Sequence, residues 1–198
     1  MRVTVFDYGA GNLHSLVKAL AGPGTTVHVE PNPTAAVETD LLVLPGVGAF
    51  SSAVARLAPG ADAMRRALAD GLPCIGICLG MQLMFDASEE GPGQGLGIFP
   101  GPVRRLQADR IPQIGWNTVA NVTEPTILRA GLREVYYANS YVCAPTDTRS
   151  VVAWSTHEHD RFAAAVRTGR VLGVQFHPEK SSQPGVRMLH EFLGEVRG

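Results

Sequence analysis

Short apolar runs alternate with stretches of helical character along the first half of the chain. Runs rich in β-branched residues predict strands at 2–8, 25–30, 41–46 and 73–78. Helices are predicted at 13–22, within 61–71 and at 79–88. This alternation is typical of a parallel sheet with crossover helices.

The second half has a different pattern, in which strands follow one another closely. Strands are predicted at 102–106, 134–142, 150–156, 161–167 and 171–177, and an amphipathic helix at 183–196 closes the chain. No internal repeat or low-complexity linker separates the two halves, so we expect both to share one sheet. The predicted fold is a single α/β domain over residues 1–198, a three-layer sandwich around a mainly parallel sheet with an antiparallel extension.

Composition excludes several classes of function. Hydrophobic residues make up 45% and charged residues 18%, and the formal net charge is -1, so nothing favours nucleic acid or an acidic membrane surface. No apolar run approaches the roughly 18 to 20 residues that span a bilayer. The N-terminal residues lack the pattern of a signal peptide, and three cysteines cannot all pair within one chain. We expect a cytoplasmic protein.

Four glycine-rich or polar segments follow predicted strands. Ligands of open parallel sheets bind outside the carboxyl ends of the strands, where such segments gather. We therefore expect these four to meet in one site: DYGAGN (7–12), PGVGAF (45–50), GICLGM (76–81) and FHPEKS (176–181).

Cys78 lies at the predicted turn from a strand into a helix, between Gly76 and Gly80. Small residues at this spacing are typical of a nucleophile elbow, a sharp turn that leaves the nucleophile accessible above the sheet. The N-terminus of the following helix would favour the thiolate. A buried structural cysteine would have the same motif. Cys74 and Cys143 lack this context and are predicted to be core residues.

His177 and Glu179 follow the last predicted strand. In extended chain, residues two apart point the same way, so the carboxylate would lie beside the imidazole and orient it. His-Pro-Glu by itself is also common as a polar turn. Its combination with the cysteine elbow favours a Cys-His-Glu catalytic triad.

Three further motifs are candidates for ligand binding. Gly46 and Gly48 in PGVG would let backbone N–H groups turn toward a ligand, as an oxyanion hole requires, although they could simply turn the chain. GAGN (9–12) lacks the full pattern of a phosphate-binding loop. HEHD (157–160) has no metal-site spacing and predicts a polar turn between strands. We expect no metal and no cofactor.

With these motifs in place, the chain resembles the class I (triad) glutamine amidotransferases. GICLGMQ matches their nucleophile motif and FHPEKS their acid-base motif. More narrowly, DYGAGNL, LPGVGAF, GLGIFPG and IGWN resemble the glutaminase subunits of imidazole glycerol phosphate synthases, enzymes of histidine biosynthesis. The likeness runs from residue 3 to the C-terminal helix.

The resemblance implies hydrolysis of L-glutamine to glutamate and ammonia by Cys78, His177 and Glu179. N–H groups of Leu79 and of the Val47–Gly48 segment would form the oxyanion hole. Gln82, Ser140 and Tyr141 would hold the substrate. The ammonia would pass, within a heterodimer, to a barrel-shaped cyclase subunit. By the resemblance, the positions that contact this subunit are Asn12, Trp116, Tyr136 and Lys180.

Two departures from the family pattern concern the substrate pocket and the subunit contact. Asn139 stands where histidine usually precedes Ser-Tyr, and PQIGWN (112–117) replaces a form with His-Met before the Gly-Trp-Asn. Two other functions stay open from the residues themselves. One is a cysteine peptidase or related hydrolase, and the other is a degenerate subunit that binds a synthase without catalysis.

Overall fold

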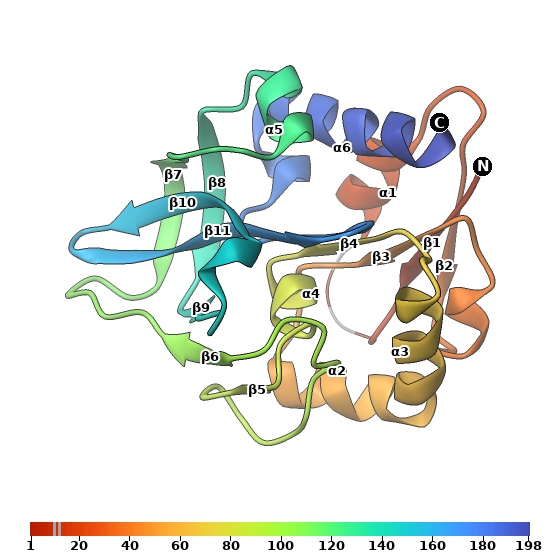
Figure 1. Cartoon of the computed structure of the whole chain (residues 1–198), viewed down its shortest axis with the longest axis horizontal. Coiled ribbons are helices and arrows are strands. Elements are labelled where there is room, and N and C mark those ends of the chain that lie inside the picture. The colour runs from red at the N-terminus through yellow and green to blue at the C-terminus, as the bar shows by residue number, and fades with distance from the viewer. Residues whose placement is uncertain (10, 12) are drawn as a thin grey trace.

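The computed structural model describes residues 1–9, 11 and 13–198, and its centre is a seven-stranded sheet (Figure 1). The strand order is β10-β11-β12-β4-β3-β1-β2. The strands of this sheet are β1 (Arg2–Phe6), β2 (Thr26–Glu30), β3 (Leu41–Leu44), β4 (Cys74–Ile77), β10 (Val151–His157), β11 (Asp160–Thr168) and β12 (Val171–Val174). Pairing is parallel from β2 through to β12 and antiparallel between β12, β11 and β10. The predicted parallel sheet with an antiparallel extension is confirmed.

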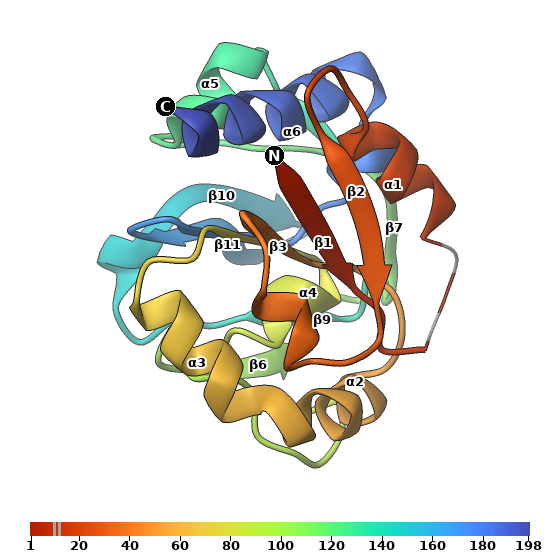
Figure 2. The ribbon, with the colours of Figure 1, turned by 90° about the vertical axis from the view of Figure 1, so that its right-hand side faces the viewer.

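Helices cover both faces of this sheet (Figure 2). On one face lie α1 (His14–Leu20), α5 (Pro125–Ala130) and α6 (Ser182–Arg197); on the other lie α2 (Phe50–Leu57), α3 (Ala61–Ala69) and α4 (Leu79–Gln82). Strands β3, β4 and β12 are buried along their whole length, which explains their unbroken apolar sequences. The three layers are thus helices, sheet and helices, with one hydrophobic core between the sheet and the helices on each side.

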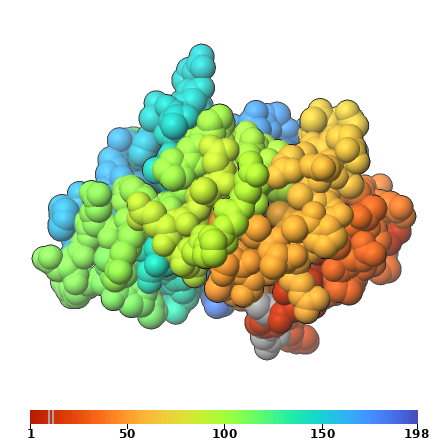
Figure 3. Space-filling model, turned by 90° about the horizontal axis from the view of Figure 1, so that it is seen from below, coloured from red at the N-terminus to blue at the C-terminus, as the bar shows by residue number. Residues whose placement is uncertain are grey.

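The remaining strands form two smaller sheets, which corrects the expectation that all strands share one. One is β5-β6-β9 (Ala87–Ser88, Pro102–Arg105 and Tyr141–Cys143), and the other is β7-β8 (Gln113–Thr118 and Glu134–Asn139). The single strand predicted at 134–142 is therefore two strands, broken at Ser140. The segment between β5 and β6 lies beside α2 and α3 (Figure 3). Arg65 of α3 donates hydrogen bonds to the carbonyls of Gly95 and Leu96 in this segment.

The helix predicted at 79–88 is wrong in length, because α4 ends at Gln82. The carbonyls of Leu83 and Met84 accept hydrogen bonds from the backbone N–H groups of Leu96 and Ile98 instead of from a continuing helix. Helices α2 and α5 and strand β7 were not predicted. No helix in the described part of the chain is long and apolar enough to cross a membrane.

Strand order brings the candidate segments together. Strand β4 lies between β3 and β12, and all three run parallel. Their carboxyl ends therefore meet at one edge, where β3 leads to Gly46, β4 to Cys78 and β12 to His177.

Candidate active site

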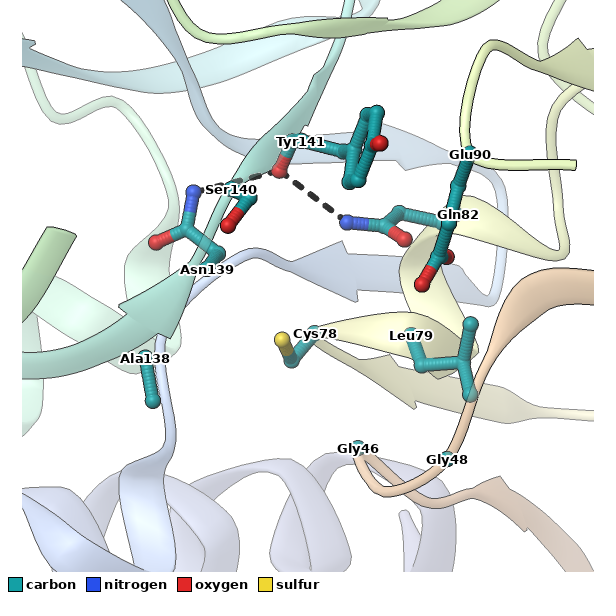
Figure 4. Close-up of a pocket in the computed structure, with 10 residues that line it drawn as sticks. All are labelled: Gly46, Gly48, Cys78, Leu79, Gln82, Glu90, Ala138, Asn139, Ser140 and Tyr141. Atoms are coloured by element: carbon teal, nitrogen blue, oxygen red, sulfur yellow. Dashed lines mark hydrogen bonds between the residues drawn. The ribbon is translucent and has the colours of Figure 1, made fainter. Parts of the chain in front are cut away.

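Cys78 occupies a sharp turn with an unusual backbone conformation, φ 48° and ψ −104°. A side chain at Gly80 would place its Cβ 1.9 Å from the carbonyl oxygen of Leu44, and one at Gly76 would lie 2.7 Å from the backbone of Gly80. The two glycines let α4 pack directly against the sheet, and the turn tips Sγ toward a cavity (Figure 4). The elbow predicted from the sequence is present.

His177 and Glu179 lie side by side and are almost buried. The imidazole Nδ1 is 2.8 Å from Glu179 Oε1, and the side chains are 3% and 8% exposed. Their proximity has a different cause from the one expected. His177 is extended, but Pro178–Lys180 forms a 3₁₀ turn, and this turn brings the carboxylate back to the ring.

The backbone around His177 is held by the neighbouring strand β8. The N–H of His177 donates to the carbonyl of Tyr136, and the Ser181 hydroxyl accepts from the N–H of Tyr136 while donating to the carbonyl of His177. The ring position is therefore fixed by both the last strand of the main sheet and the β7-β8 pair.

The pKa of His177 is raised to about 10 by its surroundings. Burial by itself lowers this pKa, but hydrogen bonds and charge interactions with Cys78 and Glu179 outweigh burial. A pKa above neutrality favours the doubly protonated ring at pH 7. Such a ring can donate a proton to a leaving group.

The loop after β3 forms the opposite wall. A Cβ at Gly46 would lie 2.9 Å from His177 Cε1 and 3.0 Å from Cys78 Cβ, so this glycine is needed for close approach. Gly48 has φ 112°, a conformation that glycine adopts freely. The Val47 side chain faces Gly11, whose added Cβ would lie 2.5 Å from it. The Tyr8 hydroxyl donates to the carbonyl of Pro45 at the start of this loop.

A cavity of about 210 Å³ lies over Cys78 (Figure 4). Of the predicted oxyanion-hole residues, Gly48 and Leu79 line it and Val47 does not. The predicted substrate residues all line it. Its walls are Gly46, Gly48, Cys78, Leu79, Gln82, Glu90, Ala138, Asn139, Ser140 and Tyr141.

The chain turn at Ser140 is fixed by two side-chain amides. Both Gln82 Nε2 and Asn139 Nδ2 donate to the carbonyl of Tyr141, each at 3.1 Å. Gln82 is 4% exposed, so it is not a surface helix residue. Asn139, one of the departures from the family pattern, therefore helps to shape the pocket wall.

Glu90 is a pocket residue that sequence reasoning missed. Its carboxylate accepts a hydrogen bond from the N–H of Phe50 at the start of α2 and reaches over the cavity opposite Ser140 (Figure 4). The only hint in the sequence is an acidic pair, Glu89 and Glu90, before the glycine-rich run at 91–97. Nothing in that run indicates which carboxylate turns inward.

The predicted partner contacts lie at the surface beside this site. Trp116 is 54% exposed and meets Tyr136 edge-on at 6.2 Å between ring centroids, and Lys180 Nζ lies 5.9 Å from the Tyr136 ring centre. Asn12 lies outside the described residues. Cys74 and Cys143 are buried thiols whose pKa burial raises, as expected for core residues.

The chain is similar to known proteins over nearly its whole length. Residues 4–196 match the family model "Glutamine amidotransferase class-I". The chain is 39% identical to the imidazole glycerol phosphate synthase subunit HisH of Microcystis aeruginosa, over 98% of this chain and 96% of that protein. Identity to the subunit of the same name from Pyrococcus furiosus is 40%, over 96% and 97%. A solved glutamine amidotransferase structure superimposes with a TM-score of 0.76 at 21% identity, covering 99% of both chains.

The protonation of His177 gives a direct test of the site's electrostatics. Negative partners favour the charged ring, so we expect NMR of its ring nitrogens to show both protons still bound at about pH 8. Cys78→Ala should lower the titration midpoint, because it removes one of the two interactions that raise the pKa. Cys74→Ala, which alters a thiol outside this network, is the matched control and should leave the midpoint in place. A wild-type midpoint near the ordinary value of 6.5 would contradict this assignment.

Proposed function

The chain belongs to the class-I glutamine amidotransferase family, and on that premise we propose that it is the glutamine-hydrolysing subunit of an imidazole glycerol phosphate synthase. The observation that carries the proposal is the contact of Glu179 with His177 beside the Cys78 elbow, at the floor of a pocket with polar walls. Family membership argues against a peptidase. The complete set of reacting groups argues against a degenerate subunit.

The first half of the reaction forms a thioester and releases ammonia. The Cys78 sulfur attacks the side-chain carboxamide carbon of glutamine, and the electron pair of the C=O bond moves to oxygen. The N–H of Leu79, which has no earlier helical carbonyl to bind, and an N–H of the Val47–Gly48 segment stabilise this oxyanion. His177 gives a proton to the amide nitrogen, the oxyanion electron pair re-forms the C=O bond, and the C–N bond breaks so that ammonia leaves and the thioester remains.

The second half hydrolyses the thioester. His177, now neutral, accepts a proton from water as the water oxygen attacks the thioester carbon. The C–S bond breaks, the electron pair returns to Cys78, and glutamate leaves. Glu179 holds the ring in position and stabilises its charged form in both halves.

The pocket walls supply recognition of the amino-acid end of glutamine. The Glu90 carboxylate provides a negative charge for the α-ammonium group, and the backbone at Ser140 and Tyr141, fixed by Gln82 and Asn139, provides the opposite wall. The amide groups of Gln82 and Asn139 carry no charge. Glu90 is thus the only carboxylate among the described pocket residues.

An apolar surface beside the pocket supports a partner that receives the ammonia. We call it the β7-β8 outer face, made of Ile114, Trp116, Tyr136 and Ala138, which pair across the two strands as Ile114 with Ala138 and Trp116 with Tyr136. Ile114 is 68% exposed. Since Ala138 also lines the pocket, a cyclase seated on this face would cover the exit beside Cys78.

The placement of the pocket next to this face has a chemical reason. Ammonia that escapes into neutral water is mostly protonated and no longer nucleophilic. A partner on the outer face would keep it unprotonated until it reacts with the cyclase substrate, a phosphoribulosyl-formimino nucleotide. The products would be imidazole glycerol phosphate and an aminoimidazole carboxamide ribotide.

Replacing the nucleophile separates the two activities of the complex. Cys78→Ala should abolish glutamine-dependent synthesis with the cyclase, because no thioester can form, while synthesis from added ammonium salt continues. Product formation from each nitrogen source measures both. Cys74→Ala is the control and should retain the glutamine-dependent rate, since Cys74 is buried in β4 away from the cavity. Loss of both activities in Cys78→Ala would contradict this division of labour.

Removing the charge of Glu90 tests its role in recognition. Glu90→Gln keeps the shape and the hydrogen bond from Phe50 but loses the attraction to the α-ammonium group, so KM for glutamine should rise about tenfold or more with a smaller change in kcat. Glu89→Gln, which alters the adjacent carboxylate outside the pocket, is the matched control. Equal KM values in both variants would exclude Glu90 from substrate binding.

Truncating the aromatic centre of the outer face tests the docking surface. Trp116→Ala should weaken association with the cyclase by about 2 kcal/mol, roughly 30-fold, because an exposed aromatic residue at the centre of an apolar face is a typical interface anchor. Lys180→Ala should weaken association or coupling more than folding. Titration calorimetry measures the affinity, and Leu128→Ala, equally exposed on α5, is the control. Unchanged affinity in Trp116→Ala would place the partner elsewhere.

A further inference from the structure

Gln175 is a fully buried polar residue with a contact to the nucleophile. Its side-chain Nε2 lies 3.5 Å from Cys78 Sγ, within hydrogen-bonding distance of sulfur, and its exposure is 0%. Its Oε1 has no hydrogen-bond partner among the described residues. Burying an amide with an unpaired oxygen is costly, so an apolar residue of similar size would suit a purely structural position better.

The backbone holds Gln175 firmly in this place. Gln175 follows the last residue of β12, and its N–H donates to the carbonyl of Ala164 in β11. On the other side of β12, the N–H of Cys78 donates to the carbonyl of Val174 at 2.7 Å. Nucleophile and amide are thus attached to one strand by short backbone connections, and their separation cannot change without disturbing the sheet.

The direction of the hydrogen bond between Gln175 and Cys78 indicates which charge state of the sulfur it stabilises. With Nε2 toward sulfur, the amide donates, and a hydrogen bond to an anion is about twice as strong as one to a neutral acceptor. The reverse orientation would place an oxygen lone pair against the thiolate. The amide does not titrate, so it remains a hydrogen-bond donor when His177 transfers its proton.

We propose that Gln175 is a catalytic residue whose amide N–H stabilises the Cys78 sulfur as a thiolate. It acts at two points of the reaction given above, on which the proposal rests. Before attack the N–H favours the nucleophilic thiolate. When the C–S bond of the thioester breaks, the same N–H stabilises the negative charge that returns to sulfur. His177 supplies the proton in the first half, and Gln175 keeps a donor at sulfur in both.

The test measures the reactivity of Cys78 without using glutamine. The rate of alkylation by iodoacetamide is followed as a function of pH in the full chain, with mass spectrometry to locate the label on Cys78. Gln175→Met has similar length and no N–H, so the midpoint of the pH profile should rise by about one unit, with an alkylation rate about tenfold lower at pH values well below the wild-type midpoint. Gln175→Glu should raise it further, because a carboxylate repels the thiolate.

A matched control separates this role from core packing. Gln113 is also a buried glutamine, 4% exposed, with neither side-chain polar atom hydrogen-bonded to a described residue, and it does not contact sulfur. Gln113→Met should leave the pH profile of Cys78 alkylation at its wild-type position, and thermal unfolding of both variants measures what each loses in packing. With the cyclase present, Gln175→Met should lose glutamine-dependent synthesis and keep synthesis from ammonium salt.

The outcomes distinguish this inference from the proposed function. A wild-type profile with a raised midpoint in Gln175→Met supports the role given to Gln175. Identical profiles in wild type and Gln175→Met would overturn it while leaving Cys78 as the nucleophile. A wild-type Cys78 that iodoacetamide does not alkylate at all would instead contradict the proposed function. If Gln175→Met fails to fold, Gln175→Glu decides, and a midpoint at or below the wild-type value would overturn the inference.

Discussion

The strained turn at Cys78 is the constraint on which the rest of the site depends. A non-glycine residue at φ 48° is costly, and it persists because α4 is pressed against the end of β3 at Gly80. The same packing sets the position of Leu79, the first residue of α4, which lines the cavity. A larger residue at position 80 would move the helix, the nucleophile and the oxyanion donor together.

The reacting groups at the site form a short series of contacts. Glu179 meets His177, His177 meets Cys78, and Gln175 adds a neutral donor at the sulfur. Burial alone would discharge the imidazole, so its charged form depends on both neighbours. Because these groups come from the ends of two adjacent strands, sheet pairing keeps the series in register.

The pocket and the β7-β8 outer face have different proposed roles: the pocket binds glutamine, and the outer face binds the partner. The cavity walls are polar and are fixed by amide hydrogen bonds to one carbonyl, that of Tyr141. The β7-β8 outer face is apolar and unusually exposed at Ile114 and Trp116. Strand β8 contributes to both the pocket and the outer face. A partner that displaced Tyr136 would therefore also shift the backbone of His177, whose N–H donates to the Tyr136 carbonyl. Substrate binding and partner binding thus share one strand pair.

The sequence by itself determined that the main sheet is mostly parallel, the elbow at Cys78 and the identity of its two partners, because apolar runs and glycine spacing are local properties. It did not reveal the length of α4, the separate β7-β8 pair, or the inward turn of Glu90. These three features depend on hydrogen bonds between segments that lie far apart in the sequence or in different elements. His177 and Glu179 were paired correctly but for the wrong reason, since a 3₁₀ turn joins them. Gln175 directly precedes the FHPEKS motif, yet only pairing of β12 with β4 places its amide at the sulfur, because contacts between strands are decided in three dimensions.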